Sequence, residues 1–164
     1  MMKNKTILAL LMLTITITGC ATNNENSQTA LSSNVTSSAG KPTYKQIDYD
    51  LTKMNANMVY ATVLNIMENT SAYIGKVIKV RGPFRPFDGL NPDYCYPAII
   101  IQDATACCAS GLEFLLYDVP HCSRNGGNGY PELEEEVTIV GRLETYLDYY
   151  TMYIRLGDAI WLKD

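Results

Sequence analysis

The sequence predicts a mainly β fold, a small five-stranded OB-like barrel preceded by one amphipathic helix. Three observations carry this prediction. One stretch with helical spacing of apolar residues comes first, and five short segments with strand-like patterns follow it. Gly82, Gly141 and Gly157 stand in or beside these strands, where bulges let a sheet coil into a barrel. Short strands with a glycine in the fourth favour an OB-like barrel, and a small two-sheet sandwich is the alternative.

The chain begins with a segment typical of an exported lipoprotein. Lys3 and Lys5 precede an apolar run over residues 7–17, which is too short to span a bilayer as a helix. The run ends in Ile-Thr-Gly-Cys, which resembles a bacterial lipobox, where the cysteine becomes the lipidated first residue after cleavage. We therefore expect residues 1–19 to be a signal peptide and Cys20 to carry the lipid. An ordinary secretory signal with an incidental cysteine is the alternative.

The charge of the chain limits its partners. The sequence has 13 basic and 17 acidic residues, and loss of Lys3 and Lys5 with the signal peptide leaves a formal charge of −6. An acidic domain repels phosphate backbones, so no nucleic-acid partner is predicted. The lipid on Cys20 is then the expected attachment, on the extracytoplasmic side of a bacterial cell membrane.

Two further segments complete the expected organisation. Residues 20–48 are rich in Asn, Ser, Thr and Ala, and such a segment buries too little apolar surface to order itself. We expect it to be a flexible, lipid-anchored linker. Residues 49–164 are long enough for one domain with its own core, the helix plus the OB-like β-barrel.

The helix is predicted between residues 52 and 69. Ala56, Tyr60, Val63 and Met67 recur at helical spacing and form one apolar stripe. Asn55 is the expected N-terminal cap, and residues 69–71 are the expected end.

The strands follow from alternating or continuous apolar runs. Leu112, Phe114 and Leu116 share one face of the third predicted strand. A long proline-containing loop is expected at residues 83–97, and a turn at residues 148–150. The five predicted strands cover residues 76–82, 98–104, 111–119, 135–145 and 151–163.

Several of these stretches carry a family resemblance. YIGKVIKVRGPF, the Cys-Cys-x-x-Gly-Leu-Glu-Phe run and EEVTIVGRL resemble an uncharacterised family of bacterial extracytoplasmic OB-like domains, here in lipoprotein form. The resemblance covers residues 54–162. It implies the OB-like fold, and for Cys107 and Cys108 it implies a zinc-related role.

A disulfide is predicted between Cys95 and Cys122. If the second and third strands form a hairpin that turns near residues 108–110, paired residues have numbers that sum to about 217 to 219, and these two cysteines fit. An exported location permits the bond, which the chain-entropy description values at about 3 to 4 kcal/mol. The alternatives are two free thiols, or a metal bound by both cysteines together with His121.

Cys107 and Cys108 have three open interpretations. Adjacent side chains on a strand point to opposite faces, so one thiol is expected to point inward and the other outward unless a bulge intervenes. The pair could pack as small buried thiols, form a strained vicinal disulfide, or bind a metal. Zinc is the alternative cofactor, and otherwise none is predicted.

The expected function is non-enzymatic. His121 is the only histidine, and no arrangement of nucleophile and base emerges. Aromatic residues gather near two predicted loops that flank the ligand face of OB barrels, where they could stack on an envelope protein, a peptide or a glycan. The alternative function is metal or redox handling through Cys107 and Cys108. The candidate ligand-binding residues are Phe87, Tyr94, Tyr96, Tyr146, Tyr149 and Tyr150.

Overall fold

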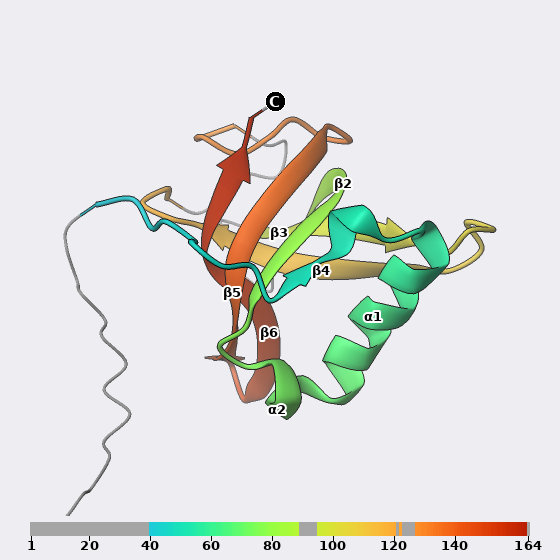
Figure 1. Ribbon diagram of the computed structural model, residues 1–164. Coiled ribbons are helices and arrows are strands. Elements are labelled where there is room, and N and C mark those ends of the chain that lie inside the picture. The colour runs from blue at the N-terminus through green and yellow to red at the C-terminus, as the bar shows by residue number, and fades with distance from the viewer. Residues whose placement is uncertain (1–39, 89–94, 121, 123–126, 164) are drawn as a thin grey trace, which may run out of the picture. The chain divides into compact units, whose positions relative to one another are not determined.

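The structure is a computed structural model that describes residues 40–88, 95–120, 122 and 127–163 (Figure 1). The predicted signal peptide, Cys20, Tyr94 and His121 lie outside the described residues. The elements are β1 (Tyr49–Asp50), the 3-10 helix η1 (Leu51–Lys53), α1 (Ala56–Glu68), α2 (Thr70–Tyr73), β2 (Val77–Asp88), β3 (Cys95–Gln102), β4 (Ala109–Leu116), β5 (Glu136–Asp148) and β6 (Thr151–Leu162). The fold is therefore mainly β with one main helix, as predicted. No helix in this described part is long and apolar enough to cross a membrane.

The main helix forms where the apolar stripe predicted it. Asn55 caps α1 because its side chain accepts a hydrogen bond from the Met58 amide at 3.0 Å. The helix ends at Glu68, and the short α2 follows directly. Val63 and Ile66 are fully buried, so α1 covers part of the sheet with its apolar face.

The six strands form one sheet in the order β1-β2-β3-β4-β6-β5, and β2 also pairs with β5. The β4–β6 and β1–β2 pairings are parallel, and the other pairings are antiparallel. Each of the strands β2 to β6 therefore has a partner on both sides. The two-residue turn between β5 and β6 lies at residues 149–150, as predicted.

Two of the predicted glycines stand where chains approach closely. A Cβ at Gly82 would lie 2.7 Å from the Ile100 carbonyl oxygen, and one at Gly141 would lie 2.7 Å from the Leu156 Cβ. The β5–β6 register also shifts next to Gly141, which is the bulge expected from the sequence. The missing side chains allow the sheet to bend over itself at these points.

The core lies between the curved sheet and α1. Leu112, Phe114 and Leu116 are buried together, which confirms the face predicted for this strand. The Phe114 ring lies 5.9 Å from the Phe84 ring and 6.0 Å from the Tyr130 ring, measured between centroids. These rings form the aromatic centre of the core.

The β3–β4 hairpin differs from its prediction. Ile99 pairs with Leu112 and Gln102 pairs with Ala109, so the turn lies at residues 103–108 and the predicted turn at residues 108–110 is wrong. Paired residues have numbers that sum to 211, whereas sums of about 217 to 219 were expected. The apolar pattern fixed which face is buried but not where the chain reverses.

The loop predicted at residues 83–97 is also shorter than expected. β2 continues to Asp88 and β3 begins at Cys95, so Pro86 and Pro97 face each other across the ladder. Proline tolerates extended backbone where it need not donate a hydrogen bond. The strands therefore extend into the stretch that the prolines had suggested was irregular.

The end of the predicted linker contacts the sheet. The Tyr44 hydroxyl donates to the Asp158 carbonyl oxygen at 2.9 Å. The Asp48 amide donates to the Val77 carbonyl oxygen at 2.9 Å, and the Asp48 carboxylate accepts from the Val77 amide at 2.8 Å. These bonds lead the chain into β1, a short strand that the sequence did not predict.

Candidate functional site

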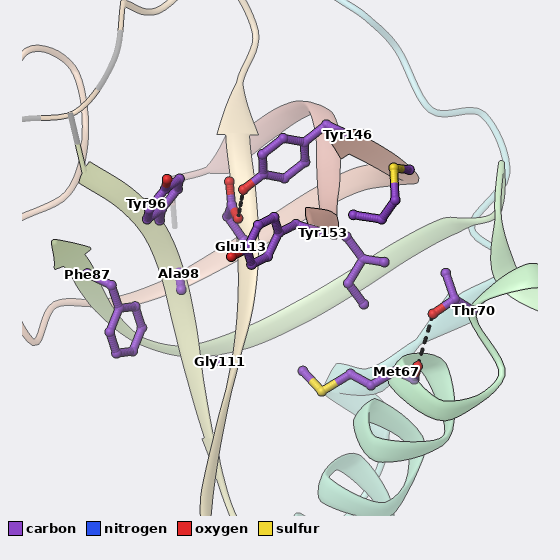
Figure 2. Close-up of a pocket in the computed structure, with 11 residues that line it drawn as sticks. Met67, Thr70, Phe87, Tyr96, Ala98, Gly111, Glu113, Tyr146 and Tyr153 are labelled. Atoms are coloured by element: carbon purple, nitrogen blue, oxygen red, sulfur yellow. Dashed lines mark hydrogen bonds between the residues drawn. The ribbon is translucent and has the colours of Figure 1, made fainter. Parts of the chain in front are cut away.

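A cavity of about 430 Å³ lies on the face of β3 and β4, beside the ends of β2, β5 and β6 and the end of α1 (Figure 2). We call it the aromatic cavity. Its walls are mostly aromatic and apolar, and Glu113 supplies the one charged group among the described residues that line it. The lining residues are Met67, Thr70, Phe87, Tyr96, Ala98, Gly111, Glu113, Tyr146, Met152, Tyr153 and Ile154.

A second cavity, of about 380 Å³, adjoins the first. The two cavities share Tyr96, Glu113 and Tyr146. Tyr149 and Arg155 line only the second one. The three shared residues therefore form a wall that both cavities can reach.

Glu113 is the central polar group of this wall. It projects from β4, and one of its oxygens, Oε2, accepts a hydrogen bond from the Tyr146 hydroxyl at 2.6 Å (Figure 2). Burial raises the pKa of Glu113 to about 7, although the Tyr146 hydrogen bond and the charge of Arg155 act to lower it. Burial, and then the same hydrogen bond, raise the pKa of Tyr146. Glu113 is thus poised to gain or lose a proton near neutral pH.

The other tyrosine of the wall is held from a different strand. The Tyr96 hydroxyl, on β3, donates to the Asp148 carboxylate at the end of β5. This hydrogen bond, followed by burial, raises the pKa of Tyr96 to about 12. The hydroxyl therefore stays protonated and its ring is fixed against the cavity.

The ring of Tyr146 is held on its faces as well. It stacks on Tyr153 with centroids 5.7 Å apart and an angle of 28° between the planes. The guanidinium of Arg155 lies over the Tyr146 ring at 4.5 Å, while its Nε donates to Glu144 at 2.7 Å. The aromatic wall is preorganised by these contacts before any ligand arrives.

The predicted ligand-binding residues are only partly brought together. Phe87, Tyr96 and Tyr146 line the aromatic cavity, and Tyr149 lines the second one. Tyr150 is 98% exposed and lines neither of these two cavities, so the structure does not bring it together with the others.

Sequence reasoning missed most residues of the cavity lining, including the charged side chains of the site. Glu113, Met152, Tyr153 and Arg155 all line one or both cavities. One signal was present, because Glu113 is the only charged residue in the run GLEFLL. A lone carboxyl group inside an otherwise apolar strand is unusual and points to a function or a partner.

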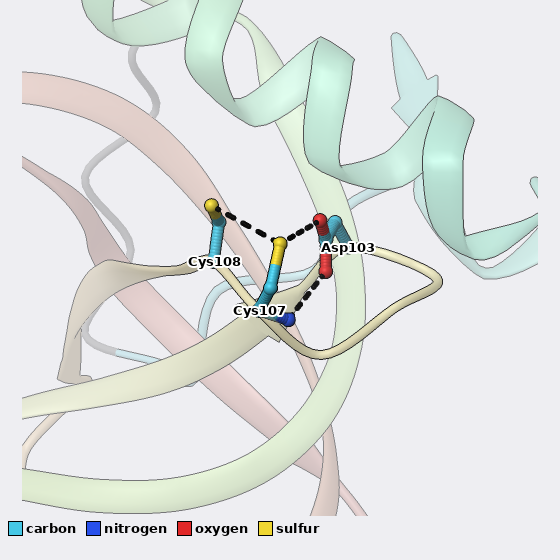
Figure 3. Close-up of side chains that lie close together, drawn as sticks. All are labelled: Asp103, Cys107 and Cys108. Carbon is cyan, nitrogen blue, oxygen red and sulfur yellow. Dashed lines mark hydrogen bonds between the residues drawn. The ribbon is translucent and has the colours of Figure 1, made fainter.

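A different cluster lies in the β3–β4 turn. We call residues 103–108 the thiol turn (Figure 3). The Cys107 Sγ lies 3.1 Å from the Asp103 Oδ2 and 3.5 Å from the Cys108 Sγ. The Cys107 amide donates to the Asp103 Oδ1 at 3.0 Å, and the Thr105 hydroxyl lies 3.1 Å from the Cys107 Sγ. Ala106, within the turn, takes a positive φ of 53°, and the sulfurs of the two cysteines lie near each other (Figure 3).

The structure corrects the expectations for this pair. Cys107 and Cys108 are free thiols and both are exposed, so buried packing and a division between opposite faces are both wrong. The Thr105 hydroxyl lowers the pKa of Cys107, but Asp103 and Cys108 raise it more, and the net shift is upward. The hydrogen bond from Cys107 lowers the pKa of Asp103.

The remaining two cysteines form the disulfide Cys95–Cys122, with the two Cα atoms 5.7 Å apart. Both residues are buried. The pairing is the predicted one, but Cys122 does not stand opposite Cys95 in the ladder. β4 ends at Leu116, Asp118 takes a positive φ of 55°, and Cys122 lies beyond this change of direction. Because both sulfurs are bonded, the alternative metal site at Cys95 and Cys122 is excluded.

No family model matches the chain, and neither a curated protein nor a solved structure does.

Proposed function

We propose that the protein is a lipoprotein anchored through Cys20 to a bacterial cell membrane, with its domain on the extracytoplasmic side acting as a non-enzymatic binding module. The aromatic cavity is the observation that carries this proposal. A concave, mostly apolar site with a few fixed polar groups is the usual form of a ligand site. The ligand is an envelope protein, a peptide or a glycan, since all of these offer surfaces on which tyrosine rings can stack.

We further propose that strands β2 to β6 form an OB-like barrel. Their pairings support it, because β2 pairs with β3, β3 with β4, β4 with β6, β6 with β5, and β5 again with β2. In such barrels the ligand lies on the second and third strands, between the loops after the first and fourth strands. The aromatic cavity supports this proposal, since Ala98 and Glu113, which line it, come from β3 and β4, the second and third strands of the proposed barrel.

The proposed location rests on the leader and on the disulfide. The leader ends in a lipobox-like sequence before Cys20, and Cys95–Cys122 is a bond that persists in oxidising compartments. Replacement of Cys20 with Ser is expected to move the chain from the membrane fraction to the soluble fraction and to remove the lipid mass. A C20S chain that stays in the membrane fraction would contradict the anchor.

Photo-crosslinking tests the binding function. Phe87 and Tyr153 are each 45% exposed at the cavity, so p-benzoylphenylalanine at either position of the full chain should capture the ligand in cells. Leu133, which is 55% exposed and lines neither cavity, is the matched control. We expect discrete adducts from the two cavity positions and none from Leu133. The same adducts from all three positions, or none from the cavity, would refute the proposal.

The thiol turn supports a second candidate function, the binding of a thiophilic metal ion such as zinc. One ligand atom from each of Asp103, Cys107 and Cys108 lies within 4.8 Å of the others. In a tetrahedral zinc site two thiolate sulfurs lie about 3.8 Å apart, close to the 3.5 Å between these two sulfurs. Two thiolates and a carboxylate suit zinc, and exposure leaves the fourth position to water.

The same geometry also supports a redox form of this candidate. Two thiols in contact can reduce an external disulfide, which gains their two electrons and two protons while a bond forms between Cys107 and Cys108. Either chemistry requires both cysteines.

Native mass spectrometry of the full chain tests the metal. We expect one zinc per chain, lost in C107S and in C108S and weakened in D103N. E132Q changes an exposed carboxylate elsewhere and should keep the zinc. Zinc that persists in the double variant C107S/C108S would exclude the thiol turn as its site.

A further inference from the structure

The aromatic cavity has a distinctive balance of charge. The described residues that line it include one carboxyl group, on Glu113, and no basic side chain. Its walls combine the rings of Phe87, Tyr96, Tyr146 and Tyr153 with two methionines. Aromatic ring faces attract cations, so both the rings and the carboxylate favour a positively charged group.

Most polar side chains of the cavity are already engaged in hydrogen bonds. The Tyr96 hydroxyl donates to Asp148, and the Tyr146 hydroxyl donates to Glu113. The Thr70 hydroxyl donates to the Ile66 carbonyl oxygen within the helical region at 3.0 Å. Among the described residues, only Tyr146 donates to Glu113, which leaves Oε1 of that carboxyl group for a ligand.

We propose that the aromatic cavity receives a lysine side chain of a polypeptide ligand, with the ammonium on the free oxygen of Glu113 and the methylenes between the aromatic rings. The inference rests on the proposed binding function and names the ligand chemistry. An alkyl stem with a charged tip matches a cavity whose walls are apolar and whose single charge lies in the shared wall.

Lysine fits this cavity better than arginine or a sugar. A guanidinium forms its best contact with both oxygens of a carboxylate, but Tyr146 already occupies Oε2 of Glu113. A sugar presents several hydroxyl groups that require partners, and the hydroxyls of Tyr96 and Tyr146 are already committed. An ammonium is a compact charge that one free oxygen can accept.

The groups around Glu113 set the pH at which it can act. Burial raises its pKa most, the hydrogen bond from Tyr146 on β5 and the charge of Arg155 on β6 lower it, and Asp148 at the end of β5 raises it. Arg155 is engaged by Glu144 and by the Tyr146 ring, and it lines the second cavity but not the aromatic cavity. With a pKa of about 7, Glu113 is mostly protonated at pH 6 and mostly ionised at pH 8. The affinity for an ammonium should therefore rise about tenfold over that range.

Titration with defined peptides tests the inference. The full chain, labelled with 3-fluorotyrosine and purified in detergent, is titrated with the capped tripeptide Ala-Lys-Ala and with its Nε-acetyl-lysine counterpart. Resonances of Tyr146 and Tyr153 are assigned from single Tyr→Phe variants. We expect saturable shifts with the lysine peptide, stronger at pH 8 than at pH 6, and at least a tenfold weaker response to the acetylated peptide, which has lost the charge.

Two variants sharpen the test. E113Q keeps the shape and removes the charge, so it should abolish the preference for lysine over acetyl-lysine, whereas E132Q should leave it intact. The lysine inference would be overturned if the wild-type chain responded equally to both peptides or responded to neither. This comparison uses only the wild-type chain and does not depend on the folding of a variant. Cross-links from Phe87 and Tyr153 that persist in that case would leave the binding module standing with another ligand.

Discussion

Two carboxyl groups on the same β3–β4 hairpin have opposite surroundings. Glu113 lies in the wall of the aromatic cavity, where burial raises its pKa to about 7. Asp103 lies in the thiol turn, where hydrogen bonds, first from Cys107 and then from Thr105, lower its pKa despite some desolvation. At neutral pH the ionised Glu113 lowers the stability of the folded state, whereas the Asp103 carboxylate stabilises its own turn. An ionisable group that lowers the stability of the fold is the better candidate for ligand recognition.

The two regions also differ in how they are assembled. The bond between Tyr146 and Glu113 joins residues 33 apart in sequence, and the bond between Tyr96 and Asp148 joins residues 52 apart. In the thiol turn, the Asp103 carboxylate bonds to residues two and four positions away, and the Ala104 amide donates to the Asn57 side chain on α1 at 3.2 Å. The aromatic cavity therefore depends on the complete sheet, whereas the thiol turn depends on its own loop conformation and on α1.

Removal of the disulfide should affect the aromatic cavity and the thiol turn most differently. The double variant C95S/C122S is expected to lose about 3 to 4 kcal/mol in the free energy of unfolding, measured by denaturant titration. Cys95 lines the second cavity, so the response of the Tyr146 resonance to the lysine peptide should weaken as well. Zinc binding at the thiol turn should persist, and its joint loss in a folded variant would show that the regions are not independent.

E113Q should reveal the stability cost of the cavity carboxylate. Folding raises the pKa of Glu113 from 4.5 to about 7. The folded protein therefore loses stability as the pH rises between these two values, and it regains none at higher pH. After allowance for partial exposure, E113Q should be more stable than the wild type by about 1 to 2 kcal/mol at pH 8. At pH 4 the two proteins should unfold alike. A difference of the same size at both pH values would mean that packing, not charge, explains it.

D103N should change the reactivity of Cys107 in the thiol turn, and this effect is expected to be smaller than that of E113Q on stability. The Asp103 carboxylate raises the pKa of Cys107, so its neutral replacement should increase the thiolate fraction. Alkylation of Cys107 by iodoacetamide at pH 7.5, followed by intact mass, should become about three times faster. E113Q serves as the control in this assay, and a similar acceleration there would contradict the local origin of the effect.

A106G should produce the smallest change. Ala106 has a φ of 53°, a left-handed conformation that glycine adopts without strain. The gain from relieved strain is partly offset by the greater freedom of glycine in the unfolded chain, so a net stabilisation below about 1 kcal/mol is expected. Thermal unfolding measures it, and binding of the lysine peptide should stay the same. Destabilisation instead would mean that the alanine methyl group contributes packing to the turn.

The sequence was most informative where a periodic pattern and a local signal coincided. The Asn55 cap, the buried face of Leu112 and Phe114, and the bulge beside Gly141 were all predictable because each depends on neighbours in the chain. The hairpin register was not, since β3 is continuously apolar from Ala98 to Ile101 and offers no mark for the turn.

The disulfide shows how a correct pairing can follow from an incomplete geometric argument. At the observed register Cys95 would face the end of β4, and a change of direction after Leu116 brings Cys122 near it instead. The candidate site was half predictable for a related reason. Its tyrosines cluster near loops in the sequence, but only the folded sheet shows that Glu113 lies among them.

The position of β6 in the sheet also determines when the domain can fold. It is the last of the six strands to be synthesised, yet it pairs with both β4 and β5. Until it emerges, β4 and β5 each lack one partner, and the strand pairs that remain among β2 to β5 are the hairpins β2–β3 and β3–β4 and the non-local pair β2–β5. Because non-local pairing slows folding, the sheet is expected to be completed only after β6 has emerged.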